Sequence, residues 1–101
     1  MSRTIVVTRH QAVVQWLESN GLSETEMVSH FTHEHIHSLR YGDVVIGILP
    51  LHILAILTSM GVRYLHVDMN VPPEYRGMEI TAEMMDRFGA KLSEYEVILK
   101  E

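Results

Sequence analysis

The sequence places an arginine and a histidine side by side where a buried strand should turn into a helix. Arg9 and His10 follow an apolar run at 4–8 and begin the helical spacing at 10–19. An arginine guanidinium is always charged and can bind a phosphate through two N–H groups, and a histidine can donate a proton near neutral pH. We therefore expect Arg9 to bind a phosphate and stabilise a phosphorane, and His10 to protonate a leaving oxygen. A solvated arginine and a histidine that only caps the helix are the alternatives.

A second strand-to-helix junction carries residues that suit the same chemistry. Gly47 would let a phosphate or base approach the backbone closely, Pro50 suits a first helical turn, and His52 faces either a ligand or the core. In open α/β sheets, ligands bind beyond the carboxyl ends of the strands, where helix N-termini favour an anion. If the two strands are neighbours, both junctions face one cleft, and Thr8 and Gln11 join the binding candidates.

Two other polar segments are weaker candidates. Arg76 and Gly77 end the segment N-V-P-P-E-Y-R-G, whose prolines would present one cation rigidly, although an ordinary exposed turn fits equally well. Four histidines between residues 30 and 37 suggest a metal site, but Glu34 is the one carboxylate among them and the segment reads as a loop. We therefore predict no metal and no cofactor. His66 lies in an expected strand, and we interpret it as structural.

The rest of the chain must supply the elements that hold the two junctions together. Buried or alternating apolar runs predict strands at 4–8, 26–30, 43–49, 62–68 and 92–99, and helical spacing predicts helices at 10–19, 50–60 and 81–88, with a loop over 31–43. Strands that alternate with helices favour an open, mostly parallel sheet with flanking helices. We therefore expect a Rossmann-like α/β fold that forms a single domain over residues 1–101. The alternation at 92–99 is typical of an edge strand.

Composition limits the kinds of partner. The chain has 101 residues, eight Lys plus Arg and a formal net charge of −5. Long nucleic acids are gripped by broad basic surfaces, so we expect none as a partner, whereas a ligand with a few phosphates needs only a local site. No apolar run reaches the length of about 18 residues that a membrane helix needs, and cysteine is absent, which favours a cytoplasmic protein without membrane contact. The small size favours a homodimer.

Three blocks of the sequence resemble one small family. They read V-V-T-R-H-Q-A-V-V-Q-W-L, G-D-V-V-I-G-I-L-P-L-H and R-Y-L-H-V-D-M-N-V-P-P-E-Y-R-G-M-E-I-T, and together they span nearly the whole chain. This pattern resembles the CRISPR-associated family that we write as Csx-sixteen, which accompanies type III systems. The resemblance implies a ring nuclease that opens cyclic oligoadenylate second messengers, most of all cyclic tetra-adenylate, on a CARF-like, Rossmann-like dimer. The histidines at 30–37 lie outside the pattern.

The resemblance also assigns residues. It implicates the matching positions Arg9 and His10 together with Thr8, Gln11, Gly47, Pro50, His52, Arg76 and Gly77. Each ribose 2′-OH of such a ring can attack its own phosphate, giving a 2′,3′-cyclic phosphate and a 5′-OH without a metal or a protein nucleophile. That fits a sequence without any of the common nucleophile motifs. The alternatives are a sensor or sponge that binds the ring without cutting it, and a metal-dependent hydrolase that uses the histidines at 30–37.

Overall fold

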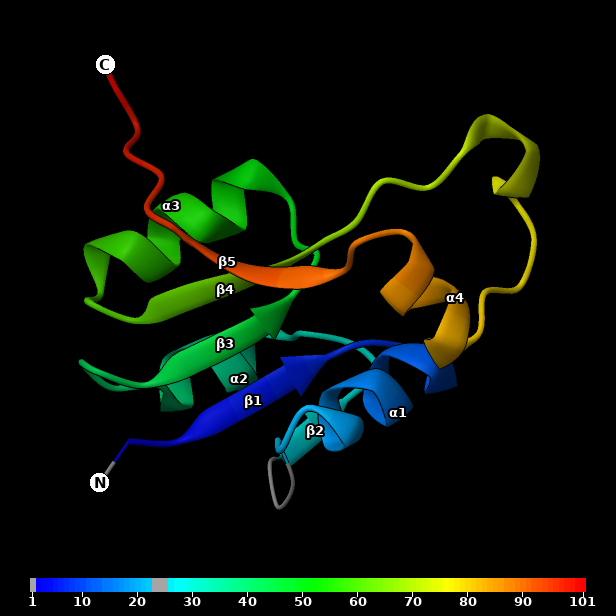
Figure 1. Cartoon of the computed structure of the whole chain (residues 1–101). Coiled ribbons are helices and arrows are strands. Elements are labelled where there is room, and N and C mark those ends of the chain that lie inside the picture. The colour runs from blue at the N-terminus through cyan, green and yellow to red at the C-terminus, as the bar shows by residue number, and fades with distance from the viewer. Residues whose placement is uncertain (1, 23–25) are drawn as a thin grey trace.

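The computed structural model describes residues 2–22 and 26–101, which form an α/β domain (Figure 1). Its strands are β1 (Thr4–Val7), β2 (Glu26–Val28), β3 (Val44–Gly47), β4 (Arg63–Asp68) and β5 (Lys91–Tyr95). Its helices are α1 (Gln11–Ser19), α2 (His33–Ser38), α3 (Leu51–Ser59) and α4 (Ala82–Arg87), with a 3-10 turn, η1 (Pro73–Tyr75), between β4 and α4.

The five strands form one sheet in the order β2-β1-β3-β4-β5. All neighbouring pairs are parallel except β4 and β5, which run antiparallel. The open, mostly parallel, Rossmann-like sheet predicted from the sequence is therefore confirmed, including the edge position of the last strand. β1 and β3 are direct neighbours, with Val7 opposite Gly47. Because chain connections leave this pair in opposite directions, it is the topological switch point of the sheet.

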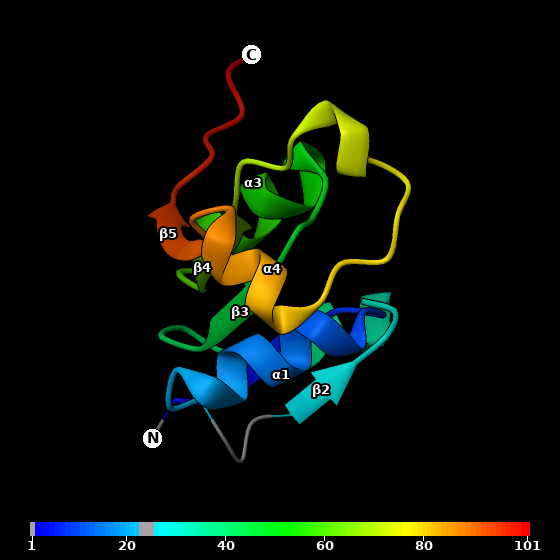
Figure 2. The same cartoon turned by 45° about the vertical axis from the view of Figure 1, so that its right-hand side comes forward.

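Helices cover both faces of the sheet, because each central strand alternates its buried side chains between two cores. Val6, Ile46 and Val67 pack with α1 and α4 on one face. Ile5, Val45 and Tyr64 pack with α3 on the other face. Figure 2 shows α1 and α4 side by side, and the Trp16 indole donates a hydrogen bond of 2.9 Å to Asp86 between them. The sheet is thus buried on both sides, as parallel strands require.

Helix α2 lies where the sequence predicted a loop over 31–43, so that prediction was wrong. The helix is short and begins with a capping box: the Thr32 hydroxyl accepts from the His35 N–H at 3.3 Å, and His35 Nδ1 accepts from the Thr32 N–H at 3.0 Å. Glutamate or glutamine usually fills the reciprocal position, so the signal was not recognised. Ile36 and Leu39 bury the apolar side of this segment.

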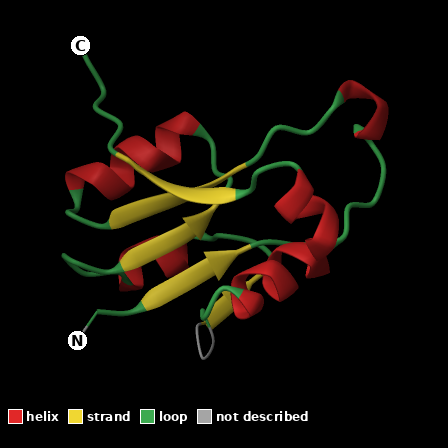
Figure 3. Cartoon of the chain, viewed as in Figure 1, coloured by secondary structure: helices red, strands yellow, loops and turns green. Residues whose placement is uncertain are grey.

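Element boundaries differ modestly from the prediction. Pro50 is the N-cap of α3 rather than a residue of its first turn. Strand β5 ends at Tyr95, and the tail that was predicted to continue it passes α3, where the Val97 N–H donates to the Thr58 hydroxyl at 2.9 Å. Figure 3 shows the short helices and the long loop that precedes α4. No helix among the described residues is long and apolar enough to cross a membrane.

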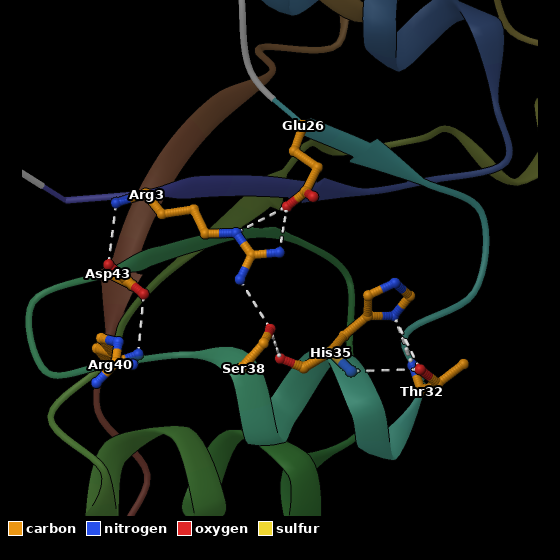
Figure 4. Close-up of polar contacts among 7 residues, drawn as sticks. All are labelled: Arg3, Glu26, Thr32, His35, Ser38, Arg40 and Asp43. Carbon is orange, nitrogen blue, oxygen red and sulfur yellow. Dashed lines mark hydrogen bonds and ion pairs between the residues drawn. The ribbon is translucent and has the colours of Figure 1, made fainter.

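A polar network ties the amino edge of the sheet together (Figure 4). The Asp43 carboxylate accepts hydrogen bonds of 2.9 Å from the backbone N–H groups of Arg3 and Arg40, and these donors lower the pKa of Asp43. Asp43 is only 6 % exposed. The Arg3 guanidinium pairs with Glu26 at 2.7 Å and donates to the Ser38 hydroxyl at 2.7 Å. One arginine therefore links the start of β1 to β2, β3 and α2.

Candidate functional site

A cleft of about 300 Å³ opens at the switch point between β1 and β3, at the carboxyl edge of the sheet. Residues at or just after the ends of three neighbouring strands line it, together with one residue of α1 and one of β4: Val7, Thr8, Arg9, His10, Val13, Ser29, Gly47, Ile48 and Val67. The two junctions singled out in the sequence therefore meet at one cleft, because their strands are neighbours. Among the described residues that line the cleft there is no carboxylate, and Arg9 supplies a permanent positive charge.

Arg9 and His10 both stand exposed at the mouth of the cleft. No hydrogen bond or ion pair involves the Arg9 guanidinium among residues 2–22 and 26–101. His10 is the N-cap of α1, but its side chain makes no capping hydrogen bond; the Thr8 hydroxyl instead accepts from the His10 N–H at 3.1 Å. The imidazole is therefore not engaged in capping, and both side chains can reach a ligand.

Gly47 has a structural reason to be glycine. A Cβ at this position would lie 2.8 Å from the Val7 carbonyl oxygen, closer than real side chains come. The neighbouring strand β1 therefore gives a reason for glycine at this position in addition to the close approach of a ligand that the sequence suggested. Because any side chain at residue 47 would push β1 away, Gly47 sets the width of the cleft floor.

The remaining predicted residues lie outside the cleft lining. Gln11 is exposed at the start of α1, and Pro50 precedes α3. His52 is exposed in α3, so the alternative of a core histidine was wrong; it borders a separate, mainly apolar hollow of about 380 Å³ beside the C-terminal tail. Arg76 and Gly77 belong to the loop over residues 69–81, which projects beyond the carboxyl edge of the sheet (Figure 1).

Gly77 explains the form of that projecting loop. Its φ angle is 83°, in the left-handed region that glycine enters most easily. The N–H of Met78 donates to the Tyr75 carbonyl at 3.1 Å and closes the turn around Arg76 and Gly77. Arg76 is exposed at this turn. It is thus presented at a tight turn, as predicted, but not among the residues that line the cleft.

Sequence reasoning missed a chain of polar groups behind the cleft. The buried Tyr64 hydroxyl donates to the Gly47 carbonyl at 2.9 Å and accepts from the Leu49 N–H at 3.2 Å. It also lies 2.6 Å from His66 Nδ1, and His66 Nε2 lies 3.7 Å from the Asp68 carboxylate. The signal was the Y-x-H-x-D alternation, which puts three polar side chains on one face of β4.

The electrostatics of this chain follow from its surroundings. Burial raises the pKa of the Tyr64 hydroxyl, which keeps it protonated and able to donate. Hydrogen bonding from Ser93 and then from Tyr95 lowers the pKa of the Asp68 carboxyl. The Tyr95 hydroxyl lies 3.1 Å from Asp68, and its ring stands edge-on to His66. An ionised carboxylate therefore flanks the imidazole on the side away from Tyr64.

The histidine-rich segment is used locally. His35 completes the capping box of α2 and stacks on Phe31 with ring centroids 5.9 Å apart. Within the described part of the chain, no three His, Asp or Glu side chains come close enough together to hold a metal ion. The interpretation of these residues as a metal site therefore gains no support from their arrangement.

Comparison with known proteins adds one family. A family model described as "Putative CRISPR-associated protein (Cas_VVA1548)" matches residues 5–98. No curated protein and no solved structure matches the chain. The matched range includes all of the residues that line the cleft and all of the polar chain behind it.

Proposed function

The chain belongs to this CRISPR-associated family, and we propose that it is a ring nuclease of type III CRISPR defence that opens cyclic oligoadenylates, most of all cyclic tetra-adenylate. The observation that carries the proposal is the exposed Arg9 guanidinium, which has no partner among the described residues and lies with His10 in a cleft at the switch point. The resemblance of the three sequence blocks to Csx-sixteen supplies the substrate class.

The proposed reaction needs positioning and charge rather than a protein nucleophile. The ribose 2′ oxygen attacks the adjacent phosphorus, a new O2′–P bond forms, and the P–O5′ bond breaks. Arg9 binds the phosphate and stabilises the charge that builds up on the phosphorane. His10 gives a proton to the leaving 5′ oxygen, and the proton of the 2′-OH passes to water. The products are a 2′,3′-cyclic phosphate and a 5′-OH, and no metal takes part.

A ring of four nucleotides is larger than one cleft, so we propose a cytoplasmic, CARF-like homodimer in which each protomer holds opposite phosphates. Thr8, Gln11 and Gly47 would contact the ring at the cleft. Two further pairs of residues would have to reach the ring from outside the cleft. They are Pro50 and His52 at the start of α3, and Arg76 and Gly77 on the projecting loop. Sedimentation at micromolar concentration tests the assembly: a monomer that still cuts the ring would overturn it.

One observation favours the second candidate, a sensor or sponge that binds the ring without cutting it. The described cleft lining contains one imidazole, that of His10, and no carboxylate, so it offers few side chains of the kinds that serve as a general acid or base. Binding would need the same cation and the same backbone groups. Cleavage needs, in addition, that the bound ring aligns a 2′-OH with its scissile bond.

A cleavage assay without metal separates the two functions. The full chain is incubated with cyclic tetra-adenylate in excess EDTA, and the products are resolved by chromatography and mass. We expect linear products that carry 2′,3′-cyclic phosphate ends, at the same rate as without EDTA. Tight binding with an intact ring would establish the sensor instead. Activity that disappears with EDTA and returns with one divalent metal would contradict the metal-free reaction.

A further inference from the structure

Helix α3 carries apolar side chains on the side that faces away from the sheet as well as on the side that packs against it. Leu54 and Leu57 bury the inner side in the core. On the outer side, Ile56 is 41 % exposed, and Leu51 at the helix start is 71 % exposed. A helix with apolar residues on both sides is normally covered on both. The outer face of α3 therefore has the composition of an interface.

The C-terminal tail extends this apolar face. The Val97 N–H donates to the Thr58 hydroxyl at 2.9 Å, which holds the tail beside α3 (Figure 1). The next two residues, Ile98 and Leu99, are 72 % and 74 % exposed. Between the tail and the outer face of α3 lies the mainly apolar hollow of about 380 Å³. Helix and tail thus form one continuous apolar surface with a groove in it.

The distribution of charge favours a second copy of this chain as the occupant. Residues 44–62 are the longest stretch of the sequence without Asp, Glu, Lys or Arg, and they include all of α3. Each of the other α-helices carries at least one glutamate. In a two-fold contact the same surface meets itself, so a charged face would repel its own copy. In a chain with a net charge of −5, α3 is therefore the helix that two copies can share without repulsion.

Charged side chains border the apolar surface where the tail passes. Glu96 precedes the three apolar residues of the tail, Lys100 follows them, and both are exposed. An apolar centre with a charged, solvated rim is the usual anatomy of a protein interface. A partner of strong charge of either sign would find no opposite charge on α3 to bind.

The course of α3 decides what such a dimer does to the cleft. Strands β3 and β4 are parallel, so α3, which connects them, starts at the carboxyl edge of the sheet and runs back toward the amino edge. A two-fold axis along α3 therefore makes both clefts open on the same side of the dimer. The polar outer residues of α3, His52 and Ser59, lie near its two ends. His52 is at the end that adjoins the clefts.

We infer that the outer face of α3 and the apolar tail at 97–99 form the interface of a homodimer whose two-fold axis runs along α3, with His52 of both protomers beside the axis and between the two clefts. That a cyclic oligoadenylate lies over this axis rests on the proposed function; the uncharged apolar face does not. The arrangement gives His52 a role, because it reaches the ring from the axis while Arg9 reaches it from either side.

Sedimentation of the full chain without ligand tests the interface. Ile56→Glu puts one carboxylate from each protomer into its apolar centre, and we expect dimerisation to weaken about a hundred-fold or more. Met27→Glu is the matched control, since Met27 is 39 % exposed on β2, the edge strand farthest from β5. It should dimerise as wild type does. A wild-type monomer at micromolar concentration, or equal dimerisation by the two variants, would overturn the inference.

A cross-link keeps the test independent of how Ile56→Glu folds. The chain has no cysteine, so a single introduced one reports on its own position. An axis along α3 brings the two copies of Ser59 together, and Ser59→Cys should therefore give a disulfide-linked dimer under mild oxidation. Ser19→Cys is the matched control at the end of α1, because both serine hydroxyls are exposed and donate to the carbonyl three residues earlier. Equal cross-linking by the two variants would overturn the axis.

Ring binding separates this inference from the proposed function. Cyclic tetra-adenylate is titrated into wild type and into His52→Ala, which keeps the apolar face; we expect unchanged dimerisation and about ten-fold weaker binding. Equal ring affinities would overturn the place of His52. A dimer that Ser59→Cys cross-links but that never cuts the ring would refute the ring nuclease alone. A ring that is cut by a dimer that Ile56→Glu does not weaken would refute this inference alone.

Discussion

Arg3 and Arg9 flank the two ends of β1, and their surroundings are opposite in kind. At the amino edge, Arg3 is paired with Glu26 and bonded to Ser38, and its own N–H satisfies the buried Asp43 (Figure 4). At the carboxyl edge, Arg9 is exposed beside a cleft and has no partner among the described residues. Arginine therefore serves two purposes in this protein. Arg3 is paired and joins strands, whereas Arg9 has no partner among the described residues and is available to a ligand.

The comparison also separates stability from function. Bonds to a buried carboxylate stabilise the fold, because removing the carboxylate leaves buried donors unsatisfied. An exposed arginine beside a cleft contributes little to folding and can be replaced without unfolding the chain. Variants at the amino edge should therefore change the free energy of unfolding, and variants at the carboxyl edge should change binding and cleavage.

Asp43→Ala should have the largest effect on folding. It removes the acceptor of two backbone N–H groups, from Arg3 and Arg40, and we expect it to lower the free energy of unfolding by about 3 kcal/mol. Urea titration followed by circular dichroism measures this, with Glu18→Ala as an exposed carboxylate control. The folded fraction of Asp43→Ala should still cut the ring at the wild-type rate. If Asp43→Ala loses less free energy of unfolding than Glu18→Ala does, the buried carboxylate does not stabilise the amino edge.

The pH dependence of stability should reveal the same carboxylate. The pKa of Asp43 is lowered in the folded chain, chiefly by the N–H groups of Arg3 and Arg40, so folding favours its ionised form. Its contribution is therefore fully present above the ordinary pKa of an aspartate and is lost as the pH falls through the lowered value. The difference in unfolding free energy between wild type and Asp43→Ala should shrink with acid. A difference that stays constant down to the lowest accessible pH would refute this.

Arg3→Ala should have the smallest effect on folding. It keeps the backbone N–H that Asp43 needs and removes the half-exposed guanidinium with its pair to Glu26 and its hydrogen bond to the Ser38 hydroxyl. Pairs of this kind contribute about 0.2–1 kcal/mol. The same urea titration measures the loss, with Arg87→Ala as an exposed control in α4. A loss as large as that of Asp43→Ala would mean that the side-chain pair, and not the buried carboxylate, holds this edge.

The sequence predicted the sheet well because its buried strands and capped helices follow strong local rules. The unbroken run at 43–49 and the turn residues around 81–89 gave β3, α4 and the edge strand β5 nearly where they lie. Helix α2 could not be predicted, because its six residues are polar on most sides and its capping box uses His35 in an unusual place. Short helices of this kind depend on tertiary packing more than on propensity.

The candidate site was predicted in part for a similar reason. Arg9, His10 and Gly47 could be grouped because strand ends in an open sheet converge on one edge. Tyr64 could not, since the Y-x-H-x-D alternation of β4 places polar side chains on one face without showing that the Tyr64 hydroxyl bonds to the backbone of Gly47 and Leu49. The close contact of Gly47 with the neighbouring Val7 carbonyl could not be predicted either. Contacts between strands far apart in sequence were the missing information.

The rate at which Arg9→Ala opens cyclic tetra-adenylate tests the central claim most directly. Cleavage is measured under single-turnover conditions in EDTA, beside Arg87→Ala as the matched arginine and with thermal melting of each variant. Losing a cation that stabilises the phosphorane costs about 2–4 kcal/mol, so Arg9→Ala should cut roughly 30- to 1,000-fold more slowly at an unchanged melting temperature. Arg87→Ala should match wild type. An Arg9→Ala variant that folds normally and cuts at the wild-type rate would show that the site is elsewhere.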